Sequence, residues 1–407
     1  MSLLCCTING VEVNCEAGTS ILEAARSAGI SIPTLCYLEG INKLGGCRLC
    51  VVEIEGMPRP IPACVTPVKD GMRITTQSAA LRDSRRQAMD RLCRQHRMDC
   101  EYCPDYTFCE LHAAIRALGM DDRPYSEVYH ERRADDSSRC LIRDSSKCIR
   151  CRRCVSTCKV LGIDAIGELF KSENSPGMRR ILLAQTSCVG CGQCVKSCPT
   201  GALFVLDETD LLWRAQNNKK KIIMGIMPES ATGIGRFFGE KTEKNELEKL
   251  AAVCKKTGAA EVFDLSGLAE AAVRELPSNT TEATFCPAHI FPDTIHTRPL
   301  EAIFDQMVRE RFGASEEVFT VFVSGCTATK QSHVSNAVLT TTELFQWIQR
   351  ACVSRFTTFD VWRKTIGVEV EKLAPQTETM RSCALKLLCP GGCRNGGGQF
   401  RTKGFQK

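Results

Sequence analysis

The sequence predicts a multidomain protein of the α+β class, and three observations support this expectation. The chain has 407 residues, too many for one small core, so two to four domains are expected. It contains 27 cysteines, and most of them occur at regular short spacings. Along the chain, alternating strand-like segments give way to helical and cysteine-rich segments, and then to apolar strands that alternate with helices.

The cysteines are expected to bind metal. Small secreted domains use many cysteines as disulfides, but this chain is long, and its first residues lack the basic start and apolar run of a signal peptide. No stretch approaches the roughly 20 apolar residues that a membrane span needs. We therefore expect a soluble protein of the cytoplasm with reduced, metal-bound thiols.

Residues 1–77 are expected to form a β-grasp domain that carries a [2Fe–2S] cluster, as in plant-type ferredoxins. The segment CTINGVEVN alternates around a turn at Asn9-Gly10, and SILEAARSAG has the pattern of a short helix capped by Ser20. A pair of glycines just before the CxxC allows backbone N–H groups to approach sulfur and stabilise negative charge. A zinc site is the alternative. The proposed ligands follow the spacing C-x10-C-x2-C-x13-C and are Cys36, Cys47, Cys50 and Cys64.

Residues 78–125 are expected to be helical and to hold a [4Fe–4S] cluster. Ser78 is placed to cap a helix through LRDSRRQAMDRLCRQ, and a histidine with three cysteines follows in HRMDCEYCPDYTFC. A neutral imidazole in place of one thiolate removes a negative charge and raises the reduction potential of a cluster. A zinc knuckle is the alternative. The proposed ligands are His96, Cys100, Cys103 and Cys109.

Residues 138–207 carry two copies of C-x2-C-x2-C-x3-C, in CIRCRRCVSTC and CVGCGQCVKSCP, which predict a bacterial-type ferredoxin domain with two [4Fe–4S] clusters. In this arrangement the fourth cysteine of each run binds the other cluster. One cluster is therefore assigned to Cys148, Cys151, Cys154 and Cys198. The second cluster is assigned to Cys188, Cys191, Cys194 and Cys158.

Cluster binding changes the meaning of the formal charge of +6, which counts every cysteine as neutral. A cluster with four thiolates carries about −2, and one with three thiolates and a histidine about −1. Four clusters would bring the chain close to neutrality. A nucleic-acid partner is therefore not expected.

Residues 208–220 are expected to form a polar connection, and residues 221–407 an α/β domain. KIIMGIM and FTVFVSG are apolar runs suited to buried parallel strands, and NELEKLAAVCKK and TTELFQWIQRACV have helical periodicity. The segment GIGRFFG hints at a dinucleotide loop, but its third glycine, Gly239, is one residue late for G-x-G-x-x-G. No nucleotide or flavin site is assigned.

Eight further cysteines have no ligand pattern and are expected to be reduced thiols: Cys5, Cys6, Cys15, Cys93, Cys140, Cys254, Cys352 and Cys383.

The order of these cluster motifs resembles the N-terminal half of [FeFe]-hydrogenases, and also the large iron–sulfur subunit of respiratory complex I and of NAD-dependent formate dehydrogenases. The second half resembles the [FeFe]-hydrogenase catalytic subunit in GIMPESATGIGRFFGE, VLTTTELFQWI, TFCPAH, SGCTATKQS and LCPGGCRNGGGQF. By this resemblance the domain is a truncated hydrogenase-like domain. Four cysteines match the positions of the cluster ligands of the family and imply a further [4Fe–4S] cluster: Cys286, Cys326, Cys389 and Cys393.

Other positions depart from the family pattern and imply a degenerate member without a functional diiron subcluster. Phe285 stands where the family has a proton-relaying cysteine, and Thr329 where it has a lysine that holds a cyanide of the diiron site. Lys330 lies one residue late. Ser332 replaces a glutamate of the proton path, and Ser324 replaces a methionine.

The resemblance implies the hydrogenase-like iron–sulfur subunit of an electron-bifurcating NAD(P)H–ferredoxin oxidoreductase or transhydrogenase. Flavin and NAD(P) would belong to flavoprotein partner subunits of a hetero-oligomeric complex, and ferredoxin would be the low-potential partner. No catalytic residue is assigned to this chain, and no cofactor-binding residue beyond the cluster ligands. Two alternatives stay open: an active [FeFe]-hydrogenase subunit, and the iron–sulfur subunit of an NAD-linked formate dehydrogenase-type complex.

Overall fold

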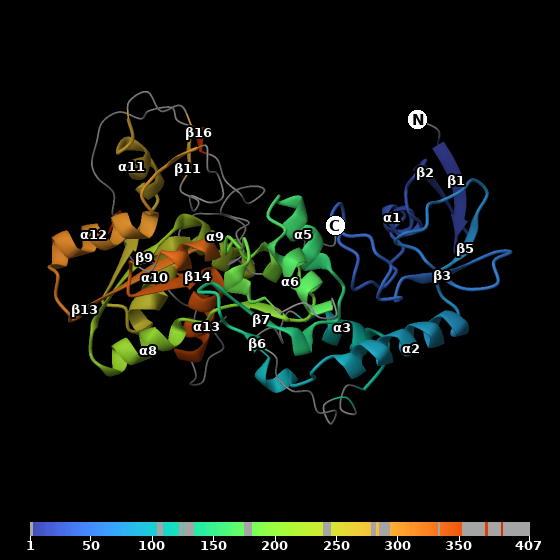
Figure 1. The fold of residues 1–407 in the computed structure, drawn as a ribbon, viewed down its shortest axis with the longest axis horizontal. Helices are drawn as coiled ribbons and strands as arrows, with labels where there is room; N and C mark the ends of the chain where they lie inside the picture. The colour runs from blue at the N-terminus through green and yellow to red at the C-terminus, as the bar shows by residue number, and fades with distance from the viewer. Residues whose placement is uncertain are drawn as a thin grey trace.

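A computed structural model describes most of the chain, in an elongated arrangement with the N-terminal domain at one end and an α/β domain at the other (Figure 1). The cysteine-rich segment that contains α5 and α6 lies between them. The described residues are 3–103, 109–121, 125, 134–174, 181–238, 246–277, 282–284, 294–332, 334–351, 371–372 and 384–385.

The N-terminal domain has the expected β-grasp arrangement. Strands β1 (Leu3–Ile8) and β2 (Val11–Glu16) form a hairpin through Asn9 and Gly10, which both have positive φ angles. The sheet order is β2-β1-β5-β3-β4, and it is completed by β3 (Val51–Ile54), β4 (Ile61–Pro62) and β5 (Arg73–Thr75). Helix α1 (Ile21–Ser27) begins with a capping box between Ser20 and Glu23. The resulting core contains Cys50 and Cys64.

The second segment is helical, as predicted. Helix α2 (Ala79–Gln95) is capped by Ser78, whose hydroxyl accepts from the N–H of Leu81, and it ends at His96. The short helix η1 (Cys100–Tyr102) and helix α3 (Glu110–Ala117) follow. Apolar side chains of α2 and α3 pack against Leu35, Cys36, Cys47 and Leu49 of the β-grasp domain.

The cysteine-rich segment is built on a three-stranded sheet of order β6-β7-β8, with β6 (Ala134–Asp135), β7 (Leu141–Asp144) and β8 (Leu203–Val205). Between β7 and β8 lie η3 (Ser145–Lys147), α5 (Arg153–Val160), α6 (Ala165–Asn174), η4 (Leu183–Gln185) and α7 (Gln193–Ser197). Both CxxC loops have left-handed backbone at corresponding positions, at Arg150 and Arg152 in the first and at Gly190 and Gly192 in the second. The internal repeat in the sequence is thus a repeat in backbone conformation.

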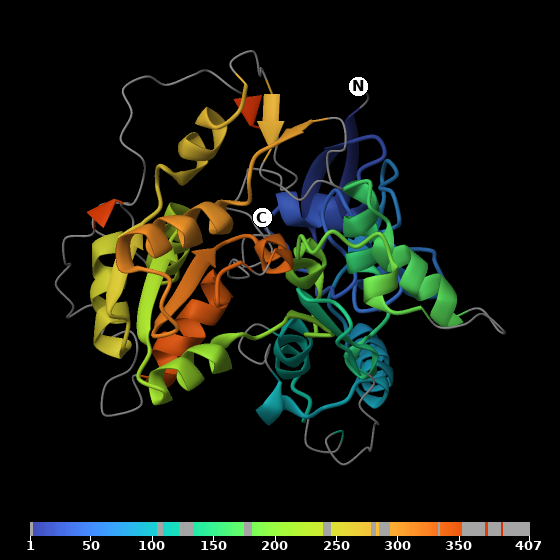
Figure 2. The ribbon, with the colours of Figure 1, turned by 60° about the vertical axis from the view of Figure 1, so that its left-hand side comes forward.

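The C-terminal domain is centred on a parallel sheet of order β14-β13-β9-β10-β15, with helices on both faces (Figure 2). Its strands are β9 (Lys221–Ile226), β10 (Glu261–Asp264), β13 (Val318–Ser324), β14 (Ala337–Thr340) and β15 (Glu371–Lys372). Ile222 and Met224 pack on one face with α8 (Thr209–Asn217), α9 (Pro228–Phe237), α10 (Glu246–Thr257) and α13 (Thr341–Ala351). Ile223 packs on the other with α11 (Leu268–Arg274) and α12 (Leu300–Phe312).

Two features complete this domain. A small parallel sheet of order β12-β11-β16 contains β11 (Glu282–Thr284), β12 (Ile295–His296) and β16 (Ala384–Leu385). Residues 209–217, expected to belong to a polar connection, instead form α8. The many polar residues of this segment led to the prediction of a connection, but the helix is amphipathic, with Leu212 and Ala215 buried against the sheet.

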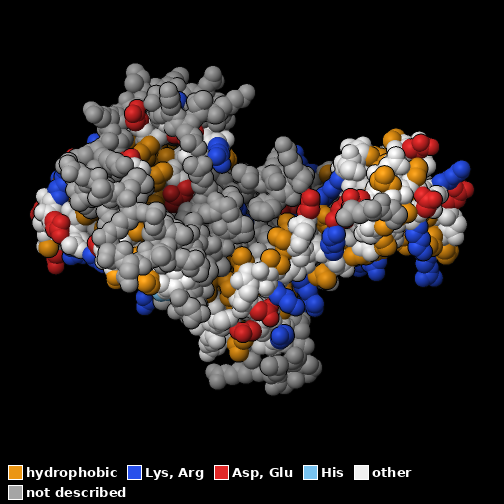
Figure 3. Space-filling model, turned by 90° about the horizontal axis from the view of Figure 1, so that it is seen from above, with side chains coloured by type: hydrophobic (Ala, Val, Ile, Leu, Met, Phe, Trp, Pro, Cys, Tyr) orange, Lys and Arg blue, Asp and Glu red, His pale blue; other side chains and the backbone are white. Residues whose placement is uncertain are grey.

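The space-filling view shows the β-grasp domain as an arm that projects from the rest, with acidic and basic side chains of both signs on its described surface (Figure 3). In the parts of the chain that the structure describes, no helix has both the length and the apolar composition needed to cross a bilayer.

Candidate functional site: a chain of cysteine-rich loops

The first cysteine set lies between the β-grasp core and helix α2. Cys36, Cys47 and Cys50 precede β3, and Cys64 follows β4. Hydrogen bonds from the thiols of Cys47 and Cys64 lower the pKa of the Cys36 thiol, and the same contacts raise the pKa values of Cys47 and Cys64. The thiol of Cys64 likewise lowers the pKa of Cys50. The backbone N–H groups of Gly46 and Cys47 also stabilise the Cys36 thiolate. Four converging, buried thiols with N–H donors fit a core of positive metal and sulfide.

Arg85 of α2 reaches the backbone next to Cys50. The residue is 7 % exposed, and its guanidinium donates to the carbonyls of Leu49, Val51 and Thr76, at 2.8 to 3.0 Å. Burial lowers the pKa of Arg85, and the charge of Cys50 opposes this effect. A buried cation therefore lies beside the loop that carries Cys50.

His96 is held in the tautomer that a metal ligand requires. Its Nδ1 lies 2.8 Å from the carbonyl oxygen of Lys147, so Nδ1–H donates and Nε2 is left as the ligand atom. Burial lowers the pKa of His96 to about 4, which keeps the imidazole neutral near neutral pH. Lys147 and Arg97 both form ion pairs with Asp99, at 2.8 and 2.7 Å, and fix the segment between His96 and Cys100.

The three cysteines that follow His96 lie at the ends of short helices. Cys100 begins η1, Cys103 follows it, and Cys109 caps α3 by accepting from the N–H of His112 at 3.4 Å. Cys100 and Cys109 pack on the same apolar cluster as Cys36, Cys47 and Cys151. The structure thus brings this segment against both neighbouring cysteine sets.

The fourth cysteine of each ferredoxin-like run lies near thiols of the other run. Burial, followed by the charges of Cys151, Cys198 and Cys148, raises the pKa of Cys154 well above its usual value. Burial, followed by Cys191, Cys188, Cys154 and Cys158, does the same for the pKa of Cys194. Cys198 therefore lies with the first run, and Cys158 with the second. Crowded buried thiols of this kind need the charge of a metal core to ionise together.

Among the described residues, no group of three or more His, Cys, Asp or Glu side chains is arranged to hold a single metal ion. A single zinc ion needs sulfur ligands about 2.3 Å from one centre. A cluster keeps its ligands apart by the width of its own core, so this finding concerns mononuclear sites only.

Cys326 lies in the C-terminal domain, directly before η5 (Thr327–Gln331). The hydroxyl of Thr329 donates to the carbonyl of Cys326 at 2.6 Å, and the hydroxyl of Ser332 to the carbonyl of Thr329 at 3.0 Å. Ser324 donates to Glu229 at 3.4 Å and accepts from the N–H of Cys326 at 3.1 Å. These three replacement residues thus serve the local fold of the loop.

Lys330 does not point to a ligand site. It is fully buried, and its ammonium donates to the carbonyl of Val338 at 2.5 Å and to Glu343 at 3.0 Å, with Glu208 at 3.4 Å. Glu208 in turn accepts from the N–H of Val338 at 2.8 Å. Lys330, which lies one residue after the position of the family's lysine, therefore joins η5 to α13 and to the segment around Glu208.

Several predicted positions fall outside the described residues. These are Cys286, Cys389, Cys393, Phe285, Cys352 and Cys383. Gly233 and Gly235 of GIGRFFG lie inside helix α9, and a Cβ on Gly235 would collide with the carboxyl group of Glu246. Gly235 therefore permits close packing against Glu246, and both glycines belong to a helix and not to a phosphate-binding loop.

Three family models match successive parts of the chain. Residues 3–79 match the 2Fe-2S iron-sulfur cluster binding domain, residues 147–202 the 4Fe-4S dicluster domain, and residues 220–380 the C-terminal domain of the iron only hydrogenase large subunit. The chain therefore has the multidomain α+β organisation that the sequence predicted.

Curated relatives are subunits of larger assemblies. The NADP-reducing hydrogenase subunit HndD of Solidesulfovibrio fructosivorans is 36 % identical over 292 residues, which cover 68 % of this chain and 48 % of that protein. The NADPH-Fe(3+) oxidoreductase subunit alpha of Geobacter sulfurreducens is 38 % identical over 41 % of this chain and 20 % of that protein. The mitochondrial NADH-ubiquinone oxidoreductase 78 kDa subunit of Neurospora crassa is 32 % identical over 48 % of this chain and 27 % of that protein. The matched residues thus span about half of the first relative and about a fifth to a quarter of the others.

Proposed function

We propose that this chain, whose residues 220–380 belong to the family of iron-only hydrogenase C-terminal domains, transfers electrons and does not turn over hydrogen itself. It would be the iron–sulfur subunit of a flavin-based electron-bifurcating NAD(P)H–ferredoxin oxidoreductase or transhydrogenase complex. The names of the relatives, which include a NADP-reducing hydrogenase subunit and an NADPH-Fe(3+) oxidoreductase subunit, support this class.

The observation that carries the proposal is that each cysteine-rich segment contacts another. Cys36 and Cys47 share one apolar cluster with Cys100 and Cys109, and hydrogen bonds join the later segments. The carbonyl of Lys147, directly before Cys148, accepts from the imidazole of His96 and from the hydroxyl of Thr200. The N–H of Glu110, directly after Cys109, donates to the carbonyl of Pro199 at 3.0 Å. The hydroxyl of Thr327 donates to the carbonyl of Gly190 at 2.5 Å.

The proposal assigns one cluster to each set of ligands. One [2Fe–2S] cluster belongs to Cys36, Cys47, Cys50 and Cys64. Three [4Fe–4S] clusters belong to the His96 set, the Cys148 set and the Cys188 set, and a fourth [4Fe–4S] cluster to Cys326 with Cys286, Cys389 and Cys393. When bound, such clusters accept and release single electrons. The domains would be residues 1–77, 78–125, 138–207 and 221–407.

The state of Lys330 supports the absence of a diiron subcluster. Its buried ammonium is committed to Glu343 and Val338, and the neighbouring Thr329 hydroxyl is committed to the carbonyl of Cys326. Phe285 carries no exchangeable proton. The family roles of these positions would therefore have no side chain to perform them here.

The remaining parts of the proposal concern partners. Flavoprotein subunits would bind NAD(H) or NADP(H) and convert hydrides into single electrons, ferredoxin would exchange electrons at low potential, and the complex would work in the cytoplasm. Anaerobic purification of the tagged chain from its native host tests this. The proposal expects a flavin-containing partner and about 14 iron atoms per chain for four clusters, or about 18 for five. A purified complex without any flavoprotein contradicts it.

A further inference from the structure

Asn42 connects two cysteine sets that lie in different domains. Its side-chain Nδ2 donates to the carbonyl of Cys36 at 2.6 Å and to the carbonyl of Cys151 at 3.2 Å. Its Oδ1 accepts from the hydroxyl of Ser156 at 2.6 Å. The residue is only 2 % exposed, so water has little access to this connection.

The orientation of this amide is fixed by its surroundings. Both hydrogens of Nδ2 are used by carbonyl oxygens, and a reversed amide would place Oδ1 against those same acceptors. The backbone is fixed as well, because the N–H of Asn42 donates to the carbonyl of Leu38 at 2.7 Å and its carbonyl accepts from the N–H of Leu38 at 2.9 Å. All polar groups of Asn42 are therefore engaged in one arrangement.

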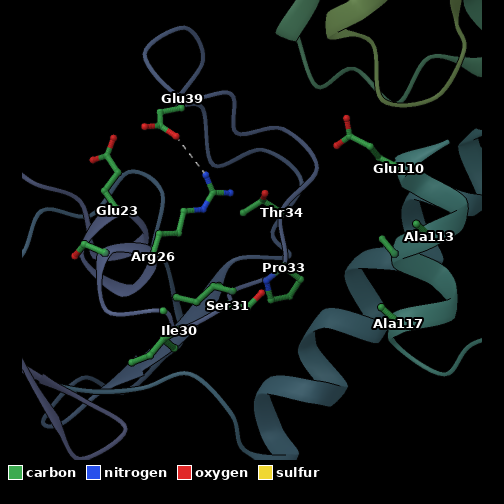
Figure 4. A pocket seen from close by; sticks show the side chains of 14 residues that line it. Glu23, Arg26, Ile30, Ser31, Pro33, Thr34, Glu39, Glu110, Ala113 and Ala117 are labelled. Carbon is green, nitrogen blue, oxygen red and sulfur yellow. Dashed lines mark ion pairs between the residues drawn. The ribbon is translucent and has the colours of Figure 1, made fainter. Parts of the chain in front are cut away.

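The β-grasp domain is not packed closely against helix α3 everywhere. A cavity of about 690 Å³ separates part of the β-grasp domain from helix α3, with Arg26 and Glu39 on one side and Glu110, Ala113 and Ala117 on the other (Figure 4). The apolar cluster that contains Cys36 and Cys151 packs the two domains together without directional contacts. Asn42 adds the directional contact, between the very residues that carry one proposed ligand of each cluster.

We propose that Asn42 is a positioning residue that sets electron transfer between the [2Fe–2S] site of Cys36 and the [4Fe–4S] site of Cys151. Its amino group holds the two carbonyls at a fixed separation and joins the two ligand residues through a pair of hydrogen bonds. The step moves one electron, oxidising the first cluster and reducing the second, and it makes or breaks no bond and releases no proton. This inference rests on the proposed cluster assignments.

The full chain offers a local way to inject the electron. Cys5 of β1 lies in the β-grasp domain, and it is the exposed cysteine among those that the structure describes. A thiol-reactive ruthenium photosensitiser on Cys5, with a sacrificial amine as electron donor, would reduce the [2Fe–2S] site first. Transient absorption then follows the passage of that electron to the [4Fe–4S] sites. The reference is the labelled wild-type chain with its full complement of clusters.

We expect Asn42→Leu to slow this transfer severalfold, because it removes both hydrogen bonds that hold the two ligand residues at a fixed separation. Its iron content and the EPR signature of each separate cluster should match those of the wild type, whereas the spin–spin interaction between the two reduced clusters should weaken. Asn42→Ser, with one hydroxyl donor, should lie between the two and serves where the leucine variant does not fold. Ser156→Ala is the matched control, because it removes only the donor to Oδ1 and should stay within about twofold of wild type.

Two results would overturn the inference. One is a transfer rate and a spin–spin interaction in both Asn42 variants equal to wild type. The other is an equal loss in Ser156→Ala and Asn42→Leu, which would assign the effect to general packing. A wild-type chain that binds no clusters would instead overturn the proposed function, and iron analysis distinguishes that failure from the first two.

Discussion

The hydroxyl of Thr327 donates a hydrogen bond of 2.5 Å to the carbonyl of Gly190, although the two residues lie 137 positions apart in the sequence. The contact joins the loop after Cys326 to the CxxC loop between Cys188 and Cys191. Gly190 has a positive φ of 67° and lies directly against the thiol of Cys140 and the amide of Gln331. The hydrogenase-like domain is therefore fitted closely onto one cysteine loop of the ferredoxin-like domain.

Gly190→Ala is expected to disturb this contact. A Cβ at this position would lie 2.8 Å from both Cys140 Sγ and Gln331 Nε2, in a left-handed backbone conformation. We expect a destabilisation of about 2–4 kcal/mol, from overpacking and backbone strain together. Calorimetry of the anaerobic protein should show a lower unfolding temperature.

Gly162→Ala is the control for this variant, since Gly162 also has a positive φ but open space around its Cβ position. It should lose only about 1 kcal/mol. Equal losses in the two variants would show that the close approach of the two domains contributes nothing.

Lys330→Met is expected to leave two buried carboxylates, Glu208 and Glu343, without their cation. Removing one partner of a buried ion pair typically costs about 3–5 kcal/mol. Burial already raises the pKa of Glu343, and Lys330 lowers it, so loss of the lysine should raise it further. A carboxyl group whose pKa is higher in the folded state binds more protons when folded. The penalty should therefore grow as the pH rises above the ordinary value of about 4.5.

Thermal unfolding of this variant and the wild type from about pH 4.5 upward to about pH 8 checks both the size and the pH dependence of the effect. Adding Glu343→Gln to Lys330→Met should restore part of the loss. Lys255→Met removes an exposed pair with Glu261 and should cost less than about 1 kcal/mol. A pH-independent penalty would contradict the proposed role of the Glu343 charge.

The cysteine loops could be predicted from the sequence better than the contacts between them. The hairpin at Asn9-Gly10 and the Ser78 cap follow from local turn and capping chemistry. The assignment of Cys158 and Cys198 to opposite clusters follows from spacing and stays a prediction. The contacts of Asn42 could not be predicted, because an asparagine after a glycine resembles an ordinary turn residue. Its partner Cys151 also lies 109 positions away in the sequence. Lys330 was noticed only as a displaced residue, since its partner Glu208 comes from a segment expected to be a polar connection.

Arg85→Met is expected to make the [2Fe–2S] cluster harder to reduce. The buried guanidinium lies beside the Cys50 loop, and its positive charge favours the additional electron. We expect the potential to fall by about 60 mV, the equivalent of a tenfold change in a one-electron equilibrium. An EPR-monitored redox titration measures this. Arg86→Met, on the exposed side of the same helix, should leave the potential unchanged, and an equal shift in both variants would contradict the local effect.

Cys326→Ser tests the cluster proposed for the hydrogenase-like domain. If Cys326 binds a [4Fe–4S] cluster, its loss should lower the iron content by about four atoms per chain without changing the EPR signals of the other clusters. The control is Cys254→Ser, because Cys254 is buried in the core next to the parallel sheet. Iron contents equal to wild type in both variants would show that Cys326 holds no cluster.

Mössbauer spectroscopy of the whole chain, purified without oxygen from cells grown on isotopically enriched iron, tests the central claim most directly. It distinguishes every class of bound iron in one sample. The account predicts one [2Fe–2S] cluster, at least three [4Fe–4S] clusters and no low-spin diiron component. A diiron component, or a chain that carries zinc in place of cluster iron, would contradict it.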